Sequence, residues 1–368
     1  MAKGCLVICL VIVICGIGVL SKAAEPPALA RLSGVEKERL AKLIAGAKKE
    51  GELIGYSGTW RPDVQAKMIP LFRQEYGLSD SDLKIKIIST RTGAIVTKIS
   101  EELRAKVYKT DIVNTAPTSF YDDLIAKGEI MAYDSPEYKH FSPLVADPNL
   151  GPANPPYYIS GKVTAYVITY NPQYIKEEIV HWKDVLKYKG KISCGDVSKS
   201  FSYTEAYLAI RKVIDKKFFQ DLGKLKPFLL VSATDLLNKC VTGEYPIVLI
   251  SSPNTVFRLN QKGAGLKIVF PPEGWPAVGW PVAILSRALH PNAAKLFIDF
   301  VHGESCQELF LNFAGDIMGR LGLKSKYPDY PKPIYELKGS INMDWRKVTQ
   351  QERLDAREEF RRSVIEGK

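Results

Sequence analysis

Hydrophobic positions along most of the chain follow two spacings, one typical of helices and the other typical of buried strands. Between Leu40 and Ala47 they recur every three or four residues, which predicts an amphipathic helix that Gly51 ends. The short apolar run at residues 53–56 then predicts a buried strand. Further strands alternate with helices and are expected at residues 84–89 and 111–114. This alternation predicts an α/β fold built on parallel sheets.

A second α/β unit follows residues 146–158, whose proline and asparagine content is typical of a linker. Two longer β-rich runs, at residues 163–170 and 278–285, lie at the two ends of this unit. Residues 350–368 have the pattern of a highly charged helix, for which we expect packing on the surface. The other strands of the unit are expected at residues 192–194, 229–231, 247–250 and 267–270.

The first residues carry the pattern of a secretory signal. Lys3 gives a positive start, residues 4–20 contain no charged side chain, and the small residues Ser21 and Ala23 precede a predicted cut before Ala24. We therefore expect residues 1–23 to be a cleaved signal peptide that exports the chain. Because the apolar run reaches only the lower limit of a membrane-spanning segment, an uncleaved N-terminal anchor is the alternative.

The rest of the chain is too long for one hydrophobic core, so two lobes are expected. The formal net charge of +11 falls to +9 without Lys3 and Lys22, which suits an anionic ligand or an anionic membrane surface. Since the basic residues are interleaved with Asp and Glu, we expect no nucleic-acid partner. Cys194, Cys240 and Cys306 show no metal-ligand spacing; they are either buried free thiols or include a Cys194–Cys240 disulfide.

Several segments stand in an order that is shared with a known family. They lie at residues 43–51, 91–102, 182–192, 243–245, 270–274 and 290–300, and the last reads His-Pro-Asn-Ala-Ala-Lys-Leu-Phe-Ile-Asp-Phe. In these segments the chain resembles the bacterial extracellular solute-binding proteins of family 1, in the branch that includes iron(III) and polyamine binders. The resemblance implies a two-lobed periplasmic binding protein of type II, in which two α/β lobes close on a ligand in the cleft between them.

The resemblance also implies a division of the chain and a role. Residues 24–162 and 286–325 would form lobe 1, and residues 163–285 would form lobe 2 with two crossing hinge strands at 163–170 and 278–285. Residues 326–368 would form a C-terminal helical tail. The protein would act in the periplasm as a monomer that captures a small molecule for the inner-membrane permease of an ABC transporter, without a cofactor and without catalysing a reaction.

Loops at strand ends supply the candidate ligand contacts, because strand carboxyl ends and helix N-termini converge on such a cleft and favour anions. The strongest candidates combine a guanidinium fork, a hydroxyl that can cap a helix and a glycine that permits close backbone approach. A serine-rich loop with a lysine in lobe 2 is expected to form an anion cradle. Each residue could instead cap a helix or pack inside a lobe. The set is Ser57, Thr59, Trp60, Arg91, Thr92, Gly93, Thr118, Ser198, Lys199, Ser200, Ser202, Tyr203, Asn254 and Trp275.

One departure from the resembled branch bears on the ligand. The iron(III) binders carry an adjacent tyrosine pair shortly after the strand that corresponds to residues 246–250, and phenolate oxygens suit ferric iron. Here residues 252–258 read Ser-Pro-Asn-Thr-Val-Phe-Arg and contain no tyrosine. We therefore expect a small organic or phosphorylated anion and no metal site, with ferric iron as the alternative ligand.

Catalytic motifs are missing from the sequence. The four histidines, His140, His181, His290 and His302, show no metal-ligand spacing. The chain also lacks a Gly-x-Ser-x-Gly elbow and a Gly-x-x-x-x-Gly-Lys phosphate loop. An exported enzyme on the same scaffold is therefore a less favoured alternative, as is a ligand-binding subunit of a membrane receptor.

Overall fold

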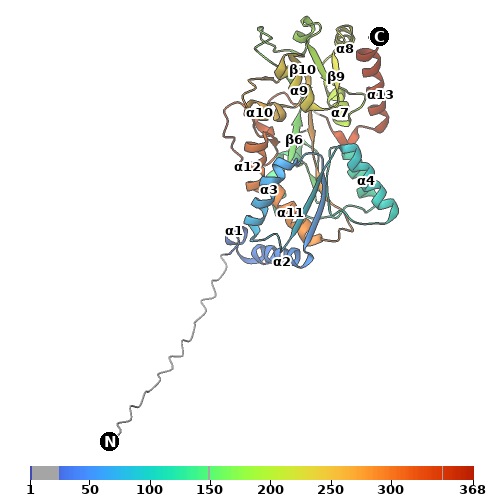
Figure 1. Ribbon diagram of the computed structural model, residues 1–368. Helices are drawn as coiled ribbons and strands as arrows, with labels where there is room; N and C mark the ends of the chain where they lie inside the picture. The colour runs from blue at the N-terminus through green and yellow to red at the C-terminus, as the bar shows by residue number, and fades with distance from the viewer. Residues whose placement is uncertain (2–24, 148–149, 342) are drawn as a thin grey trace.

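The structure, a computed structural model, describes Met1 and residues 25–147, 150–341 and 343–368. Apart from Met1, the predicted signal peptide at residues 1–23 lies outside the described residues. The described chain forms two stacked lobes, with lobe 1 below lobe 2 in Figure 1. Each lobe has its own sheet, which confirms the predicted two-lobed α/β fold. Among the helices in these ranges, none has both the length and the apolar character needed to cross a bilayer.

Lobe 1 contains a six-stranded mixed sheet. Its parallel half forms where helix and strand patterns alternate, and β13 runs antiparallel to β3. The strand order is β2 (Lys84–Ser89), β1 (Glu52–Ser57), β3 (Ile112–Asn114), β13 (Val282–Ile284), β5 (Tyr158–Ile159) and β4 (Ala153–Asn154). The helices are α1 (Pro27–Ala30), α2 (Gly34–Glu50), α3 (Pro62–Tyr76), α4 (Thr92–Ala105), α5 (Thr118–Ala126), η1 (Pro136–Phe141), α6 (Ser142–Ala146), α11 (Pro291–His302), α12 (Glu304–Leu309) and η3 (Phe310–Ala314).

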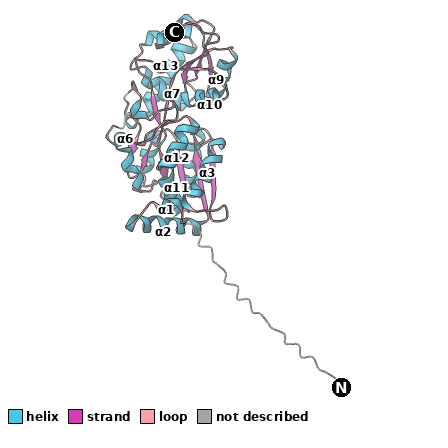
Figure 2. Cartoon of the chain, turned by 90° about the vertical axis from the view of Figure 1, so that its left-hand side faces the viewer, coloured by secondary structure: helices cyan, strands magenta, loops and turns pink. Residues whose placement is uncertain are grey.

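The core of lobe 1 is dominated by aromatic rings that α3 and α11 bring together. Phe72 of α3 lies 5.6 Å from Phe297 and 5.2 Å from Phe300 of α11, measured between ring centroids. All three side chains are buried. Figure 2 shows α3, α11 and α12 on the same face of the lobe. This packing fixes the N-terminal end of α3 at the boundary with lobe 2.

Lobe 2 contains a five-stranded sheet in which β10, β8 and β9 are parallel and β7 and β11 are antiparallel additions. The strand order is β11 (Lys267–Val269), β7 (Val167–Tyr170), β10 (Ile247–Ser251), β8 (Ile192–Gly195) and β9 (Phe228–Leu230). The helices are η2 (Trp182–Lys187), α7 (Phe201–Ile210), α8 (Lys216–Lys224), α9 (Ala233–Thr242) and α10 (Pro253–Asn260). Both sheets are thus mixed rather than purely parallel, because a strand that returns from the hinge joins each of them.

A small hinge sheet joins the lobes, in the order β12 (Ala277–Gly279), β6 (Lys162–Ala165) and β14 (Ile317–Met318). Each predicted crossing run is divided in the structure. Residues 163–170 break at Tyr166, and residues 278–285 break at Trp280 and Pro281. Pairing changes at these points because each strand leaves the hinge sheet and enters the sheet of a lobe.

The charged C-terminal tail packs against the outside of lobe 2, as expected, and also buries one face of its helix in the core of that lobe. The tail contains η4 (Ile334–Glu336), η5 (Trp345–Lys347), α13 (Gln350–Phe360) and η6 (Arg361–Ile365). It begins on lobe 1, where Ile334 joins the core, and ends with Phe360 in the core of lobe 2. In between, the indole of Trp345 donates a hydrogen bond to the carbonyl of Ala277 in the hinge, at 2.9 Å. The tail therefore forms a third connection between the lobes.

The three cysteines of the described chain are buried free thiols, so Cys194 and Cys240 do not form a disulfide. Burial raises the pKa of the Cys240 thiol to about 12. A thiol that stays protonated at neutral pH is a poor nucleophile and a poor metal ligand.

Candidate functional site

The parallel strands of both lobes end at the boundary between them, so the loops that follow these strands face one another. In lobe 1, β1 leads into α3; in lobe 2, β10 leads into α10, which lies above α3 in Figure 1. A cavity of about 550 Å³ opens between these two helices. It is lined by Arg61 and Asp63 from lobe 1 and by Thr255, Arg258 and Lys262 from lobe 2. Its size is within the range of small-molecule sites.

Two arginines reach this cavity from opposite lobes. Arg61 precedes α3 and forms an ion pair with Asp63, with 2.6 Å between Nη2 and Oδ2. Arg258 lies on α10, where its Nη2 donates to Thr255 Oγ1 at 3.0 Å. Its Nη1 also donates to the carbonyl of Ala314 in lobe 1, at 3.2 Å. The half-buried guanidinium of Arg258 is therefore oriented by contacts to both lobes.

A third cation lies next to the hinge. Lys162 is the first residue of β6, and its buried ammonium group lies 2.8 Å from Asp316 Oδ1. The same carboxylate oxygen accepts a hydrogen bond from Asn254 Nδ2, at 2.7 Å. Because Asn254 is on α10, these bonds connect lobe 2 to the hinge.

The charges around the cavity perturb one another. Burial lowers the pKa of Arg258, and the neighbouring charge of Arg61 lowers it further. Burial also lowers the pKa of Lys162; Asp316 opposes this effect, whereas Arg258 and Arg61 add to it. Burial alone would raise the pKa of Asp63, but the hydrogen bond and charge of Arg61, with the charge of Arg258, lower it. Cations that lower one another's pKa are stabilised when an anion binds between them.

Among the sequence-predicted contacts, Ser57 and Trp60 lie inside lobe 1. The Ser57 hydroxyl donates to Asn114 Oδ1 at 2.8 Å and accepts hydrogen bonds from the backbone N–H groups of Thr59 and Trp60. The Trp60 ring packs edge-on against Phe297, with 5.5 Å between centroids. Both side chains therefore shape the turn after β1 from within lobe 1.

Thr59 lies closer to the boundary between the lobes. Its hydroxyl donates to Asn114 Oδ1 at 2.8 Å, and its side chain lines a small cavity together with Lys162 and Trp280. The Nδ2 group of Asn114 in turn donates to the carbonyls of Trp280 and Pro281. Asn114, which the sequence did not single out, therefore fixes the β1 loop against the second crossing.

The segment Arg91, Thr92 and Gly93 begins α4 as predicted, but Thr92 does not cap that helix. Arg91 is exposed, and its side chain forms no hydrogen bond or ion pair with any residue the structure describes. Thr118 does not cap α5 either. Its side chain is buried, and its hydroxyl has no hydrogen-bond partner among the described residues. Neither Arg91 nor Thr118 is therefore linked by a described hydrogen bond or ion pair to Arg61 or Arg258.

The predicted anion cradle in lobe 2 contains a carboxylate that occupies its donors. Asp196 accepts hydrogen bonds from the backbone N–H and the hydroxyl of Ser198, at 3.0 and 2.5 Å. Lys199 lies 3.2 Å from the other oxygen of Asp196. Ser200 and Ser202 lie at the start of α7 with 3.3 Å between their hydroxyl oxygens. Asp196 therefore neutralises the lysine that was expected to attract an anion.

Tyr203 and Trp275 are both buried in the protein. Tyr203 packs edge-on against Tyr166, with 5.8 Å between centroids. The indole of Trp275 donates to the carbonyl of Lys338 in the tail, at 2.9 Å, and its ring contacts Phe270. Trp275 therefore anchors the tail to the hinge.

Sequence reasoning missed the three cations that define the site. Arg61 comes directly after the loop that contains Thr59, and Arg258 lies in the segment that was noted for its lack of tyrosine. Lys162 immediately precedes the first predicted crossing. Each of the three cations therefore lies next to a segment that the sequence analysis discussed. Nothing in the local sequence indicates that the three side chains lie near one another in the folded protein.

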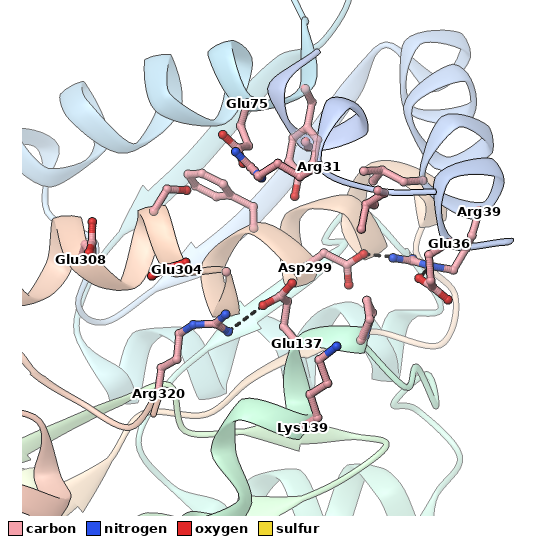
Figure 3. A pocket seen from close by; sticks show the side chains of 18 residues that line it. Arg31, Glu36, Arg39, Glu75, Glu137, Lys139, Asp299, Glu304, Glu308 and Arg320 are labelled. Carbon is pink, nitrogen blue, oxygen red and sulfur yellow. Dashed lines mark hydrogen bonds and ion pairs between the residues drawn. The ribbon is translucent and has the colours of Figure 1, made fainter. Parts of the chain in front are cut away.

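A separate cavity of about 460 Å³ lies on lobe 1 between α1, α2 and the junction of α11 with α12 (Figure 3). Several of its charged side chains form ion pairs. Asp299 binds Arg39 at 3.0 Å, and Arg320 binds Glu137 at 2.6 Å. The hydroxyl of Ser135 donates to Asp299 at 2.6 Å. These bonds hold the helices of lobe 1 together, and the cavity does not lie between the lobes.

Comparison with known proteins identifies a family and several structures with the same fold. The family model for bacterial extracellular solute-binding proteins matches residues 54–313. No curated protein sequence matches the chain.

Three solved structures show the range of relatives. Periplasmic binding protein AfuA from Actinobacillus pleuropneumoniae, with fructose-6-phosphate bound, is 20% identical, with a TM-score of 0.68 over 86% of this chain and 99% of that one. Iron-bound HitA from Pseudomonas aeruginosa is 18% identical, with a TM-score of 0.63 over 85% and 99%. The spermidine/putrescine-binding protein PotD from Streptococcus pneumoniae is 15% identical, with a TM-score of 0.64 over 86% and 99%. At these identities the similarity establishes the fold alone.

Proposed function

The chain belongs to the bacterial extracellular solute-binding protein family, and on this premise we propose that it captures a small anionic solute between its lobes for an ABC importer. The observation that carries the proposal is that Arg61 of lobe 1 and Arg258 of lobe 2 line one cavity, while both charges also act on the buried Lys162 of the hinge. A guanidinium pair can bind carboxylate or phosphate oxygens in a bidentate manner. An organic acid or a phosphorylated compound is therefore the preferred ligand class.

The proposed contacts combine residues from both lobes. Arg61, Arg258 and Thr255 would bind the anion directly, and Lys162 would contribute its charge from the hinge. Thr59 and Asn254 were both predicted from the sequence. Thr59 donates a hydrogen bond to Asn114, and Asn254 donates one to Asp316, the partner of Lys162. The serines at the start of α7 and the Arg91 loop remain predictions for a part of the ligand that extends beyond the arginines.

Closure of the lobes would bury the solute and create the form that a permease recognises. The predicted signal peptide supports a periplasmic location, and the chain would act there as a monomer that delivers its solute to an inner-membrane permease. The family is one of solute-binding proteins rather than enzymes, and we propose that this chain releases its ligand unchanged.

Ferric iron is the alternative ligand, because the resembled branch of the family includes iron(III) binders. Within the residues that the structure describes, no group of three or more His, Cys, Asp or Glu side chains is placed to hold a metal ion. Tyr327 lines the cavity, but no tyrosine lies in the segment 252–258 that begins α10. These features favour the organic or phosphorylated anion.

A thermal-shift screen tests the proposal. The panel contains inorganic phosphate, hexose phosphates, di- and tricarboxylates, spermidine and ferric citrate, with citrate alone as the matched control. Binding to the folded state should raise the melting temperature, since a ligand at a hundred times its Kd adds about 2.7 kcal/mol of stability. We expect phosphates or carboxylates to raise it. If only spermidine raises the melting temperature, or if ferric citrate raises it and citrate does not, the proposal that the ligand is an organic or phosphorylated anion is wrong.

A further inference from the structure

The boundary between the lobes contains a second notable feature, where α5 of lobe 1 meets α7 of lobe 2. A narrow void there is lined by Ala116 and Thr118 of lobe 1, Glu205 of α7, and Trp345 and Arg353 of the tail. The void has no room for a water molecule. Polar groups that face it can therefore be satisfied only by protein atoms.

Two polar atoms next to this void lack a partner in the described structure. Glu205 is 2% exposed; its Oε1 accepts a hydrogen bond from Arg353 Nε at 2.5 Å, whereas its buried Oε2 accepts none. Thr118 is 1% exposed, and its buried hydroxyl likewise has no partner. One group belongs to lobe 2 and the other to lobe 1. The boundary thus buries an unpaired carboxylate oxygen and an unpaired hydroxyl from opposite sides.

Such an arrangement makes the closed form costly. When the lobes separate, water can reach both groups and form the hydrogen bonds that the void does not supply. When the lobes meet, both groups lose these bonds without gaining new ones. Because the void is lined by residues of lobe 1, lobe 2 and the tail, we expect the penalty to depend on the relative position of the lobes.

We propose that Glu205 and Thr118 act together as a brake on lobe closure, which the binding of solute has to overcome. The brake determines the fraction of protein molecules that are closed before solute binds. This fraction in turn affects the apparent affinity for the solute. The inference rests on the proposed closure of the lobes but not on the class of solute.

The brake should weaken at low pH. Arg353 and Arg357 on α13 are the charged groups that face Glu205, and Tyr166 is its titratable neighbour. None of the described lobe 1 residues that line the void is charged. Burial raises the pKa of Glu205 to about 6, against the opposing effect of the two arginines. Closure therefore takes up a proton and should be favoured as the pH falls through about 6.

Distance measurements between spin labels on the solute-free protein test this proposal. Labels on cysteines at the exposed positions Glu101 in lobe 1 and Lys212 in lobe 2 report the separation of the lobes, and the three native cysteines that the structure describes are buried. Thr118→Val removes the unpaired hydroxyl and keeps the shape, so the ratio of closed to open protein should rise about tenfold. Thr110→Val is the matched control, because Thr110 also buries an unpaired hydroxyl but lies beyond the opposite end of β3.

The pH series gives a second, independent result. In the wild type the closed fraction should rise between pH 8 and pH 5, and Glu205→Gln should abolish this dependence. A Thr118→Val protein with the wild-type distance distribution, or an equal shift in Thr110→Val, overturns the brake. A wild type whose closed fraction does not change with pH overturns the role of Glu205. Because no solute is added, a negative result in this experiment is distinct from a failed solute screen.

Discussion

At the scale of single residues, Arg258 is the side chain on which anion binding should depend most. It is half-buried and oriented by Thr255 and Ala314. A hydrogen bond to a charged group contributes about 1.5–3 kcal/mol, so Arg258→Ala should weaken binding of the best anion in the panel by roughly 10- to 100-fold. Isothermal titration calorimetry measures this. Arg258→Lys keeps the charge and should lose less.

Arg91→Ala is the informative comparison for this experiment. Arg91 was the strongest candidate in the sequence, yet it is exposed and its side chain forms no hydrogen bond or ion pair within the described chain. Its removal should leave the affinity within about twofold, since an exposed charge is well screened. If Arg91→Ala weakens binding and Arg258→Ala does not, the anion binds at the start of α4 and our assignment of the cavity is wrong.

The sequence located the loops at this scale but not the roles of their side chains. Alternating patterns predict that Ser57 and Thr59 follow a strand, because strand ends depend on local spacing. Whether Ser57 binds a ligand depends on Asn114, which pairing of β1 with β3 brings to it from 57 positions away in the chain. Hydrogen bonds of this kind cannot be read from a single strand.

At the scale of elements, α13 should behave as part of the core of lobe 2. Phe360 is fully buried, and its ring lies 5.5 Å from that of Tyr207. Phe360→Ala should lower the free energy of unfolding by about 3–5 kcal/mol, the usual cost of removing a buried aromatic ring. Urea denaturation measures the change. Leu354→Ala on the exposed side of the same helix should change it by about 0.5 kcal/mol or less.

The tail also shows why some elements were only partly predicted from the sequence. Its helix was found because its composition favours a helix, but its many charges concealed the spacing of Arg353, Ala356 and Phe360, which are all buried. Arg353 is buried because Glu205 lies opposite it on α7. A charged residue cannot be assigned to the interior until its partner is known, and the partner here is far away in the chain.

At the scale of the whole molecule, the two-lobed order could be predicted because it depends on the succession of many helices and strands. The site could not, because it exists only when the lobes meet. Arg61 lies just before α3, Lys162 lies in the hinge and Arg258 lies on α10. The charges of these side chains lower the pKa of Lys162 and of Arg258 only because one lobe is placed on the other. No local sequence pattern predicts that placement. The cations on opposite lobes also repel each other, so the empty site itself opposes closure.

This repulsion gives a prediction for the shape of the molecule. Arg61→Glu would replace the repulsion of Arg258 by attraction across the boundary, so the solute-free protein should close, and anion binding should weaken at least about tenfold. Arg61→Gln removes the repulsion without adding attraction and should give an intermediate result. Small-angle X-ray scattering at low salt should show the radius of gyration falling in the order Arg, Gln, Glu, with the differences reduced at high salt by screening. A radius that stays constant across the three proteins would mean that the charges at this cavity do not control the position of the lobes.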